Sequence, residues 1–592
     1  MQKQDLHTFH IPVMGLAYTI DSPIRVAHMG ISSVISVMDD ELIERMNKFY
    51  SAQYKLPYKE TSTKADDFRA KRITGYLNTV DAIVKKKCND LKATLIENKT
   101  AVEGFIQTLP PLSDFRDGLQ NYIDKNLSIN HLINVVEQYF KPGAIDVNIM
   151  TKVDREHYEG KELLPVIYND AHAALRGFAE SKLNASVVLS AGMNPRLFSY
   201  FEEFPCFYPT PQHTIQKRII LKVSDYRSAL IQGQQLAKKG LWVSEYRIES
   251  GLNCGGHAFA TDGLLLGPIL QTFNENKATL VATTHELLCK ALAEKNQFVP
   301  ERPLELKITA QGGVGTAQEH DFLLKHYQLD SVGWGSPFLL VPEATSTDAD
   351  TRKLLANATE DDLYLSNISP LGIPFNTVKG TSNEFLRRER IEKNNPGSAC
   401  PRKYLALNKA YAEEGTCTAS RKHQKLALKE LKEQNLDQNS YQEQFNEIVD
   451  KACLCIGLAN PSLLEHQLEI KGEAQGVVIC PGPNMAYFTK EATLKEMMQH
   501  IYGRTNLIEV THRPHFFIKE LSMYVTHYSK EKVKVEKEPN TIKLKKLNKL
   551  KESILEGISY YEVLFKETTY FTNDKQLLMD DLKHYKATLN HM

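Results

Sequence analysis

A chain of 592 residues with equal numbers of acidic and basic side chains excludes several classes of protein at once. It is too long for one compact core, so we expect two or three domains. The 72 Lys and Arg residues balance the 72 Asp and Glu residues, which excludes a global field that attracts nucleic acid or an anionic membrane surface. The hydrophobic content of 42% is that of an ordinary soluble globular protein, and no apolar run is long enough to span a bilayer.

The N-terminal segment and the cysteine content predict a cytoplasmic location. The segment MQKQDLHTFHIPVMG lacks the basic region and the small-residue cleavage site of a secretory signal. Nine cysteines, an odd number spread through a long chain, argue against a disulfide framework. A reducing compartment is therefore expected.

The chain opens with two short apolar segments that are typical of buried parallel strands, at residues 10–15 and 32–37. Residues 21–30, between them, predict a brief helix. From residue 39 to about residue 141, Leu, Ile, Phe and Tyr recur at helical spacing among many charges. This pattern predicts a helical insertion of roughly 100 residues, which is longer than an ordinary connection.

Strand-like and helix-like segments then alternate. Six further strands are expected at residues 144–149, 185–190, 218–223, 241–246, 304–310 and 331–335. Helical spacing lies between them, for example from Thr316 to Tyr327. Eight short buried strands that alternate with helices predict an α/β fold, the (β/α)8 TIM barrel, whose functional residues lie at the carboxyl ends of the strands.

Paired glycines follow the sixth and the seventh expected strands. The sixth strand runs into Gly251-Leu-Asn-Cys-Gly-Gly-His257, and the seventh ends at Gln311-Gly-Gly-Val314 before a predicted helix. Glycine lets backbone N–H groups approach a ligand, and a strand, a glycine pair and a helix N-terminus together form a phosphate cradle. An imidazole at His257 is suited to proton transfer near neutral pH. The alternatives are an ordinary turn and a structural histidine.

The strand-end motifs resemble those of the nitronate monooxygenases, the 2-nitropropane dioxygenase-like flavoproteins. That family includes FMN-dependent enoyl-ACP reductases and the enoyl reductases of polyunsaturated-fatty-acid synthases. Its G-x-E-A-G-G-H motif is matched at both ends by residues 251–257, with Asn253 and Cys254 in place of Glu and Ala. Its A-x-G-G-I is similar to residues 310–314, and its G-V-x-x-G-T-x-F is similar to residues 332–338.

Weaker matches extend the resemblance over roughly residues 10–50 and 140–380. Pro12-Val-Met-Gly15 keeps part of the family's P-x-x-M-x-G, and Asp146-Val-Asn148 resembles its G-V-N. A P-E-A tripeptide recurs at residues 342–344, and residues 369–374 are similar to the family's segment after the barrel.

The resemblance implies a TIM barrel that binds FMN non-covalently and uses His257 as its catalytic histidine. The residues that it assigns to the FMN phosphate are Gly312, Gly313, Gly335 and Ser336. Those that it assigns to the rest of the cofactor site are Met14, Gly15, Asn148, Ser190, Gly255 and Gly256. Lys222, at the end of the fifth strand, has two interpretations: a contact with the flavin or its phosphate, or a salt bridge to a barrel carboxylate.

Three functions fit such a site. The first is an FMN-dependent oxidoreductase of the nitronate monooxygenase type, which oxidises nitronates or related small carbanion-type substrates with O2. The second is an enoyl-thioester (enoyl-ACP) reductase in which FMN takes a hydride from NAD(P)H and His257 donates a proton. The third is a non-catalytic barrel scaffold in a larger complex, with the insertion and the C-terminal region as partner surfaces.

Residues 1–384 are expected to form the barrel domain and residues 385–592 a mostly helical region. Five cysteines lie in the latter: Cys400, Cys417, Cys453, Cys455 and Cys480. A Cys-x-Cys pair suits a metal or an iron–sulfur cluster, but the spacings match no standard pattern, and buried thiols are the commoner role.

Two further segments of the C-terminal region carry predictions. Residues 477–484 predict a strand that enters a tight turn at Pro481-Gly-Pro483. The lysine-rich run from Lys530 to Lys551 predicts a solvated helix face, or a surface for an anionic partner such as an acyl carrier protein. The sequence also leaves open whether the chain forms a homo-oligomer.

Overall fold

The computed structural model describes residues 5–190, 192–470 and 475–592, and its centre is a closed barrel of eight parallel strands. The N-terminal segment is predicted to lack a secretory signal, and its first four residues lie outside the described residues. The strands follow one another around the barrel in chain order, and the first pairs with the last. They are β1 (Phe9–Ile11), β2 (Ser32–Ser36), β3 (Ile145–Met150), β6 (Ala185–Ser190), β7 (Lys217–Val223), β8 (Val243–Glu249), β9 (Lys307–Gln311) and β10 (Ser331–Gly333). The predicted TIM barrel is confirmed, and each predicted strand overlaps an observed one.

The outward-facing side chains of the strands are apolar because helices cover the outside of the barrel, whereas the inward-facing set also includes Asp146, Glu245 and Arg247. Val34, Val188 and Ile220 form a separate apolar cluster, while their neighbours along the same strands belong to the main core. Alternate residues of a strand point to opposite faces, so the separate cluster is the interior of the barrel.

The remaining elements of residues 1–384 are short turns and the helices around the barrel. The helices are α1 (Ser22–Val26), α7 (Asp170–Ala179), α8 (Pro195–Tyr200), α9 (Tyr226–Ala237), α10 (Leu266–Glu294), α11 (Ala317–His326) and α12 (Ala349–Ala356). Two antiparallel hairpins are β4 (Tyr158–Glu159) with β5 (Glu162–Leu163), and β11 (Leu363–Ser366) with β12 (Phe375–Val378). Thr316 and Glu319 form a capping box at the start of α11, so this helix begins where the sequence predicts.

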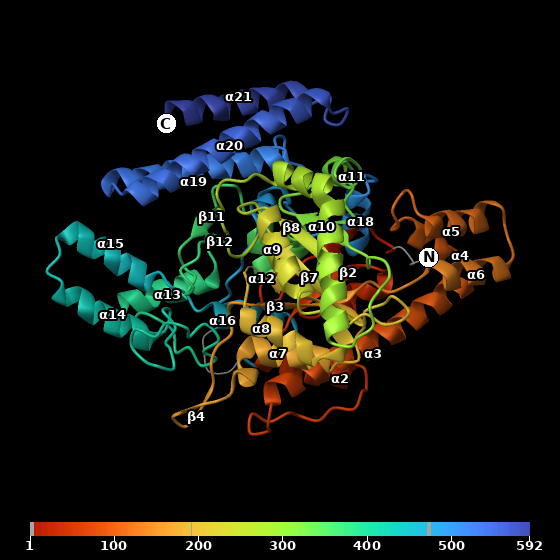
Figure 1. Cartoon of the computed structure of the whole chain (residues 1–592), viewed down its shortest axis with the longest axis horizontal. Coiled ribbons are helices and arrows are strands. Elements are labelled where there is room, and N and C mark those ends of the chain that lie inside the picture. The colour runs from red at the N-terminus through yellow and green to blue at the C-terminus, as the bar shows by residue number, and fades with distance from the viewer. Residues whose placement is uncertain (1–4, 191, 471–474) are drawn as a thin grey trace.

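The insertion between β2 and β3 is helical, as predicted. Its helices are α2 (Asp40–Gln53), α3 (Phe68–Glu97), α4 (Lys99–Ile106), α5 (Asp114–Asp124) and α6 (Ile129–Tyr139). Helix α3 packs against α2 and α7, which anchors the insertion on the barrel, and α4–α6 extend away from it (Figure 1).

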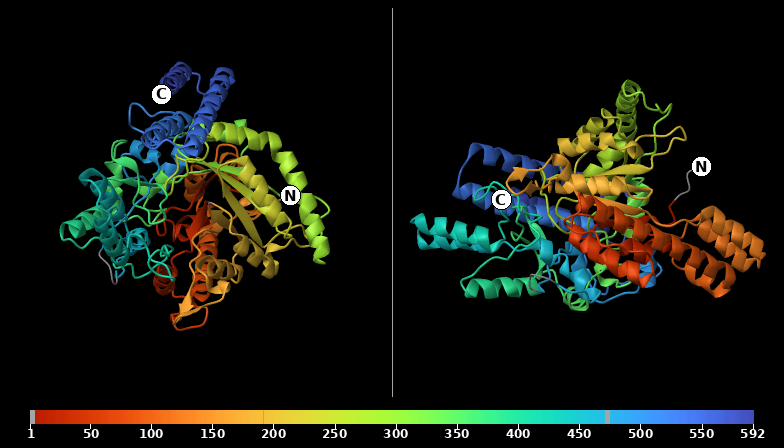
Figure 2. Two further views of the ribbon diagram at one scale, coloured as in Figure 1. Left: turned by 60° about the vertical axis from the view of Figure 1, so that its left-hand side comes forward. Right: turned by 90° about the horizontal axis from the view of Figure 1, so that it is seen from below.

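The C-terminal region is also mostly helical. Its helices are α13 (Ser382–Glu392), α14 (Arg421–Glu433), α15 (Gln438–Val449), α16 (Leu454–Gly457), α17 (Asn460–Glu465), α18 (Leu494–Ile501), α19 (Phe516–Lys537), α20 (Thr541–Glu567) and α21 (Lys575–His591). Helices α14 and α15 lie on the opposite side of the barrel from α4–α6, and α19–α21 form one layer that contacts α10 (Figures 1 and 2). Barrel residues and residues of this layer share one hydrophobic cluster. None of the described helices combines the length and the hydropathy that a bilayer crossing needs.

The strand predicted at residues 477–484 is wrong. This segment has no ladder partner, because its backbone groups bond to several separate elements in turn. Val478 donates its N–H to the carbonyl of Gly457 and accepts from the hydroxyl of Tyr18, and the carbonyl of Ile479 accepts from the hydroxyl of Thr377. The tight turn at its end is present as a 3-10 turn, Pro483–Tyr487.

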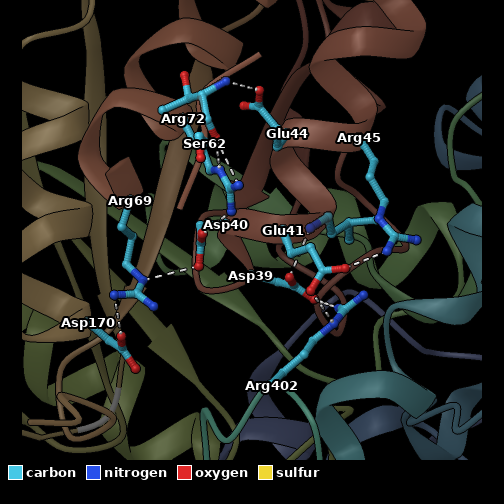
Figure 3. A network of polar contacts seen from close by, with 12 residues as sticks. Asp39, Asp40, Glu41, Glu44, Arg45, Ser62, Arg69, Arg72, Asp170 and Arg402 are labelled. Atoms are coloured by element: carbon cyan, nitrogen blue, oxygen red, sulfur yellow. Dashed lines mark hydrogen bonds and ion pairs between the residues drawn. The ribbon is translucent and has the colours of Figure 1, made fainter. Parts of the chain in front are cut away.

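A buried ion network joins the insertion to the C-terminal region (Figure 3). Asp40, which is 2% exposed, pairs with Arg69 at 3.1 Å and with Arg72 at 2.8 Å. Next to it, Asp39 pairs with Arg402, which comes from the segment between α13 and α14. Buried ions depend on their partners far more than exposed ions do, because no water replaces a lost contact.

Replacing Asp40 with Asn should lower the free energy of unfolding by about 3 kcal/mol, because Arg72 loses the carboxylate that it pairs with in a buried site. Chemical denaturation measures the change. The control is Lys85→Gln, which removes an ion pair to Asp81 from a lysine side chain that is 69% exposed, and which should cost under about 1 kcal/mol. Equal losses in the two variants would contradict a stabilising role for the network.

Candidate active site

The carboxyl ends of the barrel strands surround a cavity of about 460 Å³, a size typical of small-molecule sites. All the site residues predicted from the sequence line it: Met14, Gly15, Asn148, Ser190, Lys222, Gly255, Gly256, His257, Gly312, Gly313, Gly335 and Ser336. The structure therefore brings residues from seven strand ends together in one place. Their roles toward a ligand stay predictions.

The two glycine corners, residues 250–257 after β8 and residues 311–314 after β9, pack directly on each other. A Cβ added to Gly312, at φ +134°, would lie 2.7 Å from the Cβ of Ser250. A Cβ added to Gly313, at φ +77°, would lie 2.1 Å from Nδ2 of Asn253. Both positions therefore need glycine for the chain to approach itself, whether or not a ligand is bound.

Unbonded amides gather at the ends of β9 and β10. Within the described ranges, the N–H groups of Gly312, Gly313, Gly335 and Ser336 donate to no protein acceptor. The hydroxyl of Ser336 accepts from the N–H of Gly482 at 2.7 Å, which leaves its own O–H free to donate. Unbonded amides ahead of a helix N-terminus are a common protein ligand of a phosphate.

Gly255 and Gly256 were also predicted to contact the ligand through their backbone, but the protein itself engages part of this pair. The N–H of Gly256 donates to the carbonyl of Cys480 at 3.1 Å, so it is not available to a ligand. A Cβ on Gly255 would lie 2.5 Å from the same carbonyl oxygen. The N–H of Gly255 donates to no acceptor in the part of the chain that the structure describes, so the predicted ligand contact of this pair falls on Gly255.

His257 lies inside the cavity wall and not in bulk water. Its Nε2 is 2.7 Å from the hydroxyl of Ser369, and its ring meets that of Phe375 edge to face with the centroids 4.9 Å apart. Burial, with the charge of Lys222 as a second cause, lowers the pKa of His257 to about 4. The imidazole is therefore neutral at pH 7. No described protein group bonds its Nδ1, so this nitrogen can serve as a proton acceptor when Nε2 carries the hydrogen.

Lys222 takes the salt bridge, the second of its two predicted roles. Its Nζ lies 2.8 Å from Oε2 of Glu249, and the same oxygen accepts from Nε2 of Gln311 at 3.1 Å. The lysine still lines the cavity, so a contact with a cofactor stays a prediction.

Two carboxamide oxygens on the cavity wall have no donor. Asn148 is 3% exposed and Gln311 is 8% exposed, and neither Oδ1 of the first nor Oε1 of the second is bonded in the described structure. A buried acceptor without a partner costs free energy, so these oxygens favour a ligand that carries N–H or O–H groups.

Four of the five cysteines of the C-terminal region lie close together, and the fifth lies apart from them. Cys480 lies at the cavity, Cys400 and Cys417 share one small cluster, and Cys453 and Cys455 share another. The described residues hold no disulfide and no set of three or more His, Cys, Asp or Glu side chains placed to bind a metal. Burial, with the neighbouring thiols of Cys453 and Cys400 as further causes, raises the pKa of the Cys455 thiol.

Glu520 of α19 supports the β8 corner and was not predicted. It is 1% exposed, its Oε1 accepts from the hydroxyl of Ser250 at 2.5 Å, and its Oε2 accepts from the N–H of Leu266 at 2.8 Å. The Ser250 hydroxyl in turn accepts from the N–H of Asn253 at 3.0 Å. Because Glu520 lies far along the chain from Ser250, no local pattern in the sequence signals this contact.

Comparisons with known proteins add little. No protein-family model and no curated protein matches the chain. Among solved structures, the enoyl reductase domain of MlnA, from the macrolactin biosynthesis cluster of Bacillus amyloliquefaciens, is similar over 73% of this chain and 87% of that chain, at 14% identity and a TM-score of 0.30. Similarity at this level carries no argument about cofactor or substrate, and the barrel rests on its own strand pairing.

Burial raises the pKa of the Glu520 carboxyl from 4.5 to about 7, and this makes stability depend on pH. Between these values the unfolded chain binds fewer protons than the folded protein, so the contribution of Glu520 is present at low pH and is lost as pH rises through 7. Glu520→Gln should therefore gain about 2 kcal/mol over the wild type between pH 5 and pH 8, by denaturant unfolding at each pH. Glu536→Gln, the same substitution at an exposed position of α19, is the control. A constant offset for Glu520→Gln would contradict the raised pKa.

Proposed function

We propose that this chain is an FMN-dependent oxidoreductase of the nitronate monooxygenase type, which oxidises nitronates or related small carbanion-type substrates with O2. The observation that carries the proposal is the cavity itself. The residues that the family resemblance assigns to FMN, though scattered over more than three hundred positions of the chain, all line one cavity at the functional end of a TIM barrel.

The polar groups of this cavity fit the two ends of FMN. The unbonded amides at the ends of β9 and β10, with the hydroxyl of Ser336, supply donors for a phosphate. The unbonded oxygens of Asn148 and Gln311 supply acceptors for the N–H of a flavin ring. FMN, when bound, supplies the redox chemistry, and the protein supplies position and electrostatics.

The protonation state of His257 matches the role of a base. A neutral imidazole with an unbonded nitrogen can take the proton from the carbon next to a nitro group, and a positioned base of this kind contributes about 10²–10⁴ in rate. With a pKa of about 4, His257 carries no second proton at pH 7, so little of the imidazolium that an enoyl reductase would use as a proton donor is present, and the same low pKa makes the neutral ring a weak base. Ser369 fixes the ring orientation through its hydrogen bond to Nε2.

The first test is spectroscopic and kinetic. The purified protein should be yellow, and it should consume O2 with a nitronate in the absence of nicotinamide. Bleaching by NADH or NADPH under anaerobic conditions, reversed by an enoyl thioester but not by a nitronate, would assign the reductase function instead. A colourless protein that does not take up added FMN would favour the scaffold.

His257→Ala should lower kcat/KM for a nitroalkane by about 10²–10⁴ but change that for the matching nitronate by only a few-fold, because only the nitroalkane must lose a proton. Steady-state O2 consumption with both substrates measures the ratio. His584→Ala, on the exposed face of α21, is the matched control. Equal losses on the two substrates would remove His257 as the base.

A further inference from the structure

Arg513, in the segment before α19, lies directly behind the β9 glycine corner. Its side chain is 7% exposed, and each of its three guanidinium nitrogens is engaged. Nη2 donates to the carbonyl of Gly313 at 2.7 Å, Nη1 pairs with Glu319 at 2.7 Å, and Nε donates to Oδ1 of Asn484 at 3.1 Å. Arg513 does not line the cavity, so its effect on a ligand must pass through these partners.

The bond to Gly313 sets the direction of the next amide. In a trans peptide the carbonyl of one residue and the N–H of the following residue point to opposite sides. Arg513 holds the Gly313 carbonyl on its own side, so the N–H of Val314 points away from Arg513. Val314 lines the cavity, and within the described chain its N–H donates to no protein acceptor. Asn484 holds the carbonyl of Val314 at 2.8 Å, which fixes the following peptide as well.

Arg513 also compensates the nearest negative charge. Glu319 accepts from the N–H groups of Gly315 at 2.9 Å and Thr316 at 3.2 Å, which places a buried carboxylate at the start of α11. Burial opposes its ionisation, but the charge and hydrogen bond of Arg513, together with His515 and the N–H of Gly315, hold the pKa of Glu319 below its ordinary value. An uncompensated carboxylate here would repel an anion at the adjacent amides.

Gly315 leaves open the space that the guanidinium of Arg513 occupies. A Cβ on Gly315 would lie 2.7 Å from Nη2 of Arg513, so any larger residue would displace the guanidinium. The third glycine of Gly312-Gly-Val-Gly315 therefore serves the arginine, whereas the first two serve the contact between the corners.

We propose that Arg513 is a positioning residue for the anionic group of the ligand, the phosphate of FMN. It directs the N–H of Val314 into the cradle formed with Gly312 and Gly313, and it cancels the charge of Glu319. The inference rests on the proposed function, because the cradle matters only if a phosphate binds there.

The experiment compares FMN with riboflavin, which has the same ring and ribityl chain but no phosphate. Dissociation constants are measured by fluorescence titration of the full-length apoprotein for the wild type, Arg513→Gln and Arg513→Lys. Both variants should lose about 10- to 100-fold in affinity for FMN, since neither side chain can hold all three acceptors. Their affinity for riboflavin should stay within about three-fold of the wild type.

Arg504→Gln is the matched control. This arginine also joins the C-terminal region to backbone carbonyls, those of Gln107 at 2.9 Å and Leu109 at 2.6 Å, but outside the cavity. It should leave both dissociation constants unchanged. Circular dichroism and thermal melting identify any variant that does not fold, and Arg513→Lys, which keeps the charge beside Glu319, is the more conservative of the two.

The outcomes separate the two proposals. A wild type that binds no FMN overturns the proposed function and this inference with it. A wild type that prefers FMN to riboflavin, together with folded Arg513 variants that keep the same preference, overturns the inference alone. Equal losses for FMN and riboflavin would assign Arg513 a general structural role and would also overturn it.

Discussion

The close approach of the two glycine corners is the constraint on which the rest of the site depends. Gly312 and Gly313 carry no side chain because Ser250 and Asn253 occupy the space where a Cβ would lie. Residues of both corners line the cavity, and the unbonded amides of the β9 corner are among them. These glycines are therefore not flexible positions; they are positions where backbone and side chains are in full contact.

The barrel does not hold these corners alone. The C-terminal region reaches them at separate points: the carbonyl of Cys480 on Gly256, Arg513 on Gly313, and Glu520 on Ser250. Each contact is polar and buried, and a buried polar contact contributes direction more than net stability. The layer of α19–α21 and the segments before it are thus part of the wall of the site, although they follow the barrel in sequence. This explains why one hydrophobic cluster extends across residue 384.

Local patterns predicted the elements well, because periodicity reflects which faces of an element are buried. The barrel strands keep apolar residues on the face that the helices cover, and this face gives the signal in the sequence although the inner face carries Asp146, Glu245 and Arg247. The first strand ends at Ile11 and not at Gly15 because Pro12 has no N–H for the ladder. The error at residues 477–484 has the opposite origin: an apolar, extended sequence that packs against several elements looks the same as one that pairs with a single strand.

The sequence did not predict the contacts between residues that are far apart along the chain. The motif at residues 251–257 placed His257 in the cavity, but nothing local distinguishes a lysine that binds a cofactor from one that pairs with Glu249. Arg513 and Glu520 stand in segments whose composition predicts only ordinary helices and turns. Partner choice depends on which surfaces meet after the elements form, and a single sequence carries no record of that.

The electrostatic character of the cavity depends on several charged and polar groups of its wall together. Lys222 is paired with Glu249, and His257 is neutral at pH 7. The wall also carries the side chains of Lys152 and Asp225, a set of amide donors at the ends of β9 and β10 and, on β3 and β9, the unbonded oxygens of Asn148 and Gln311. Amide donors that are already in place bind an anion with little reorganisation. Under the proposed function, these donors and acceptors would contact the phosphate and the ring of FMN, and the neutral imidazole would act as the base.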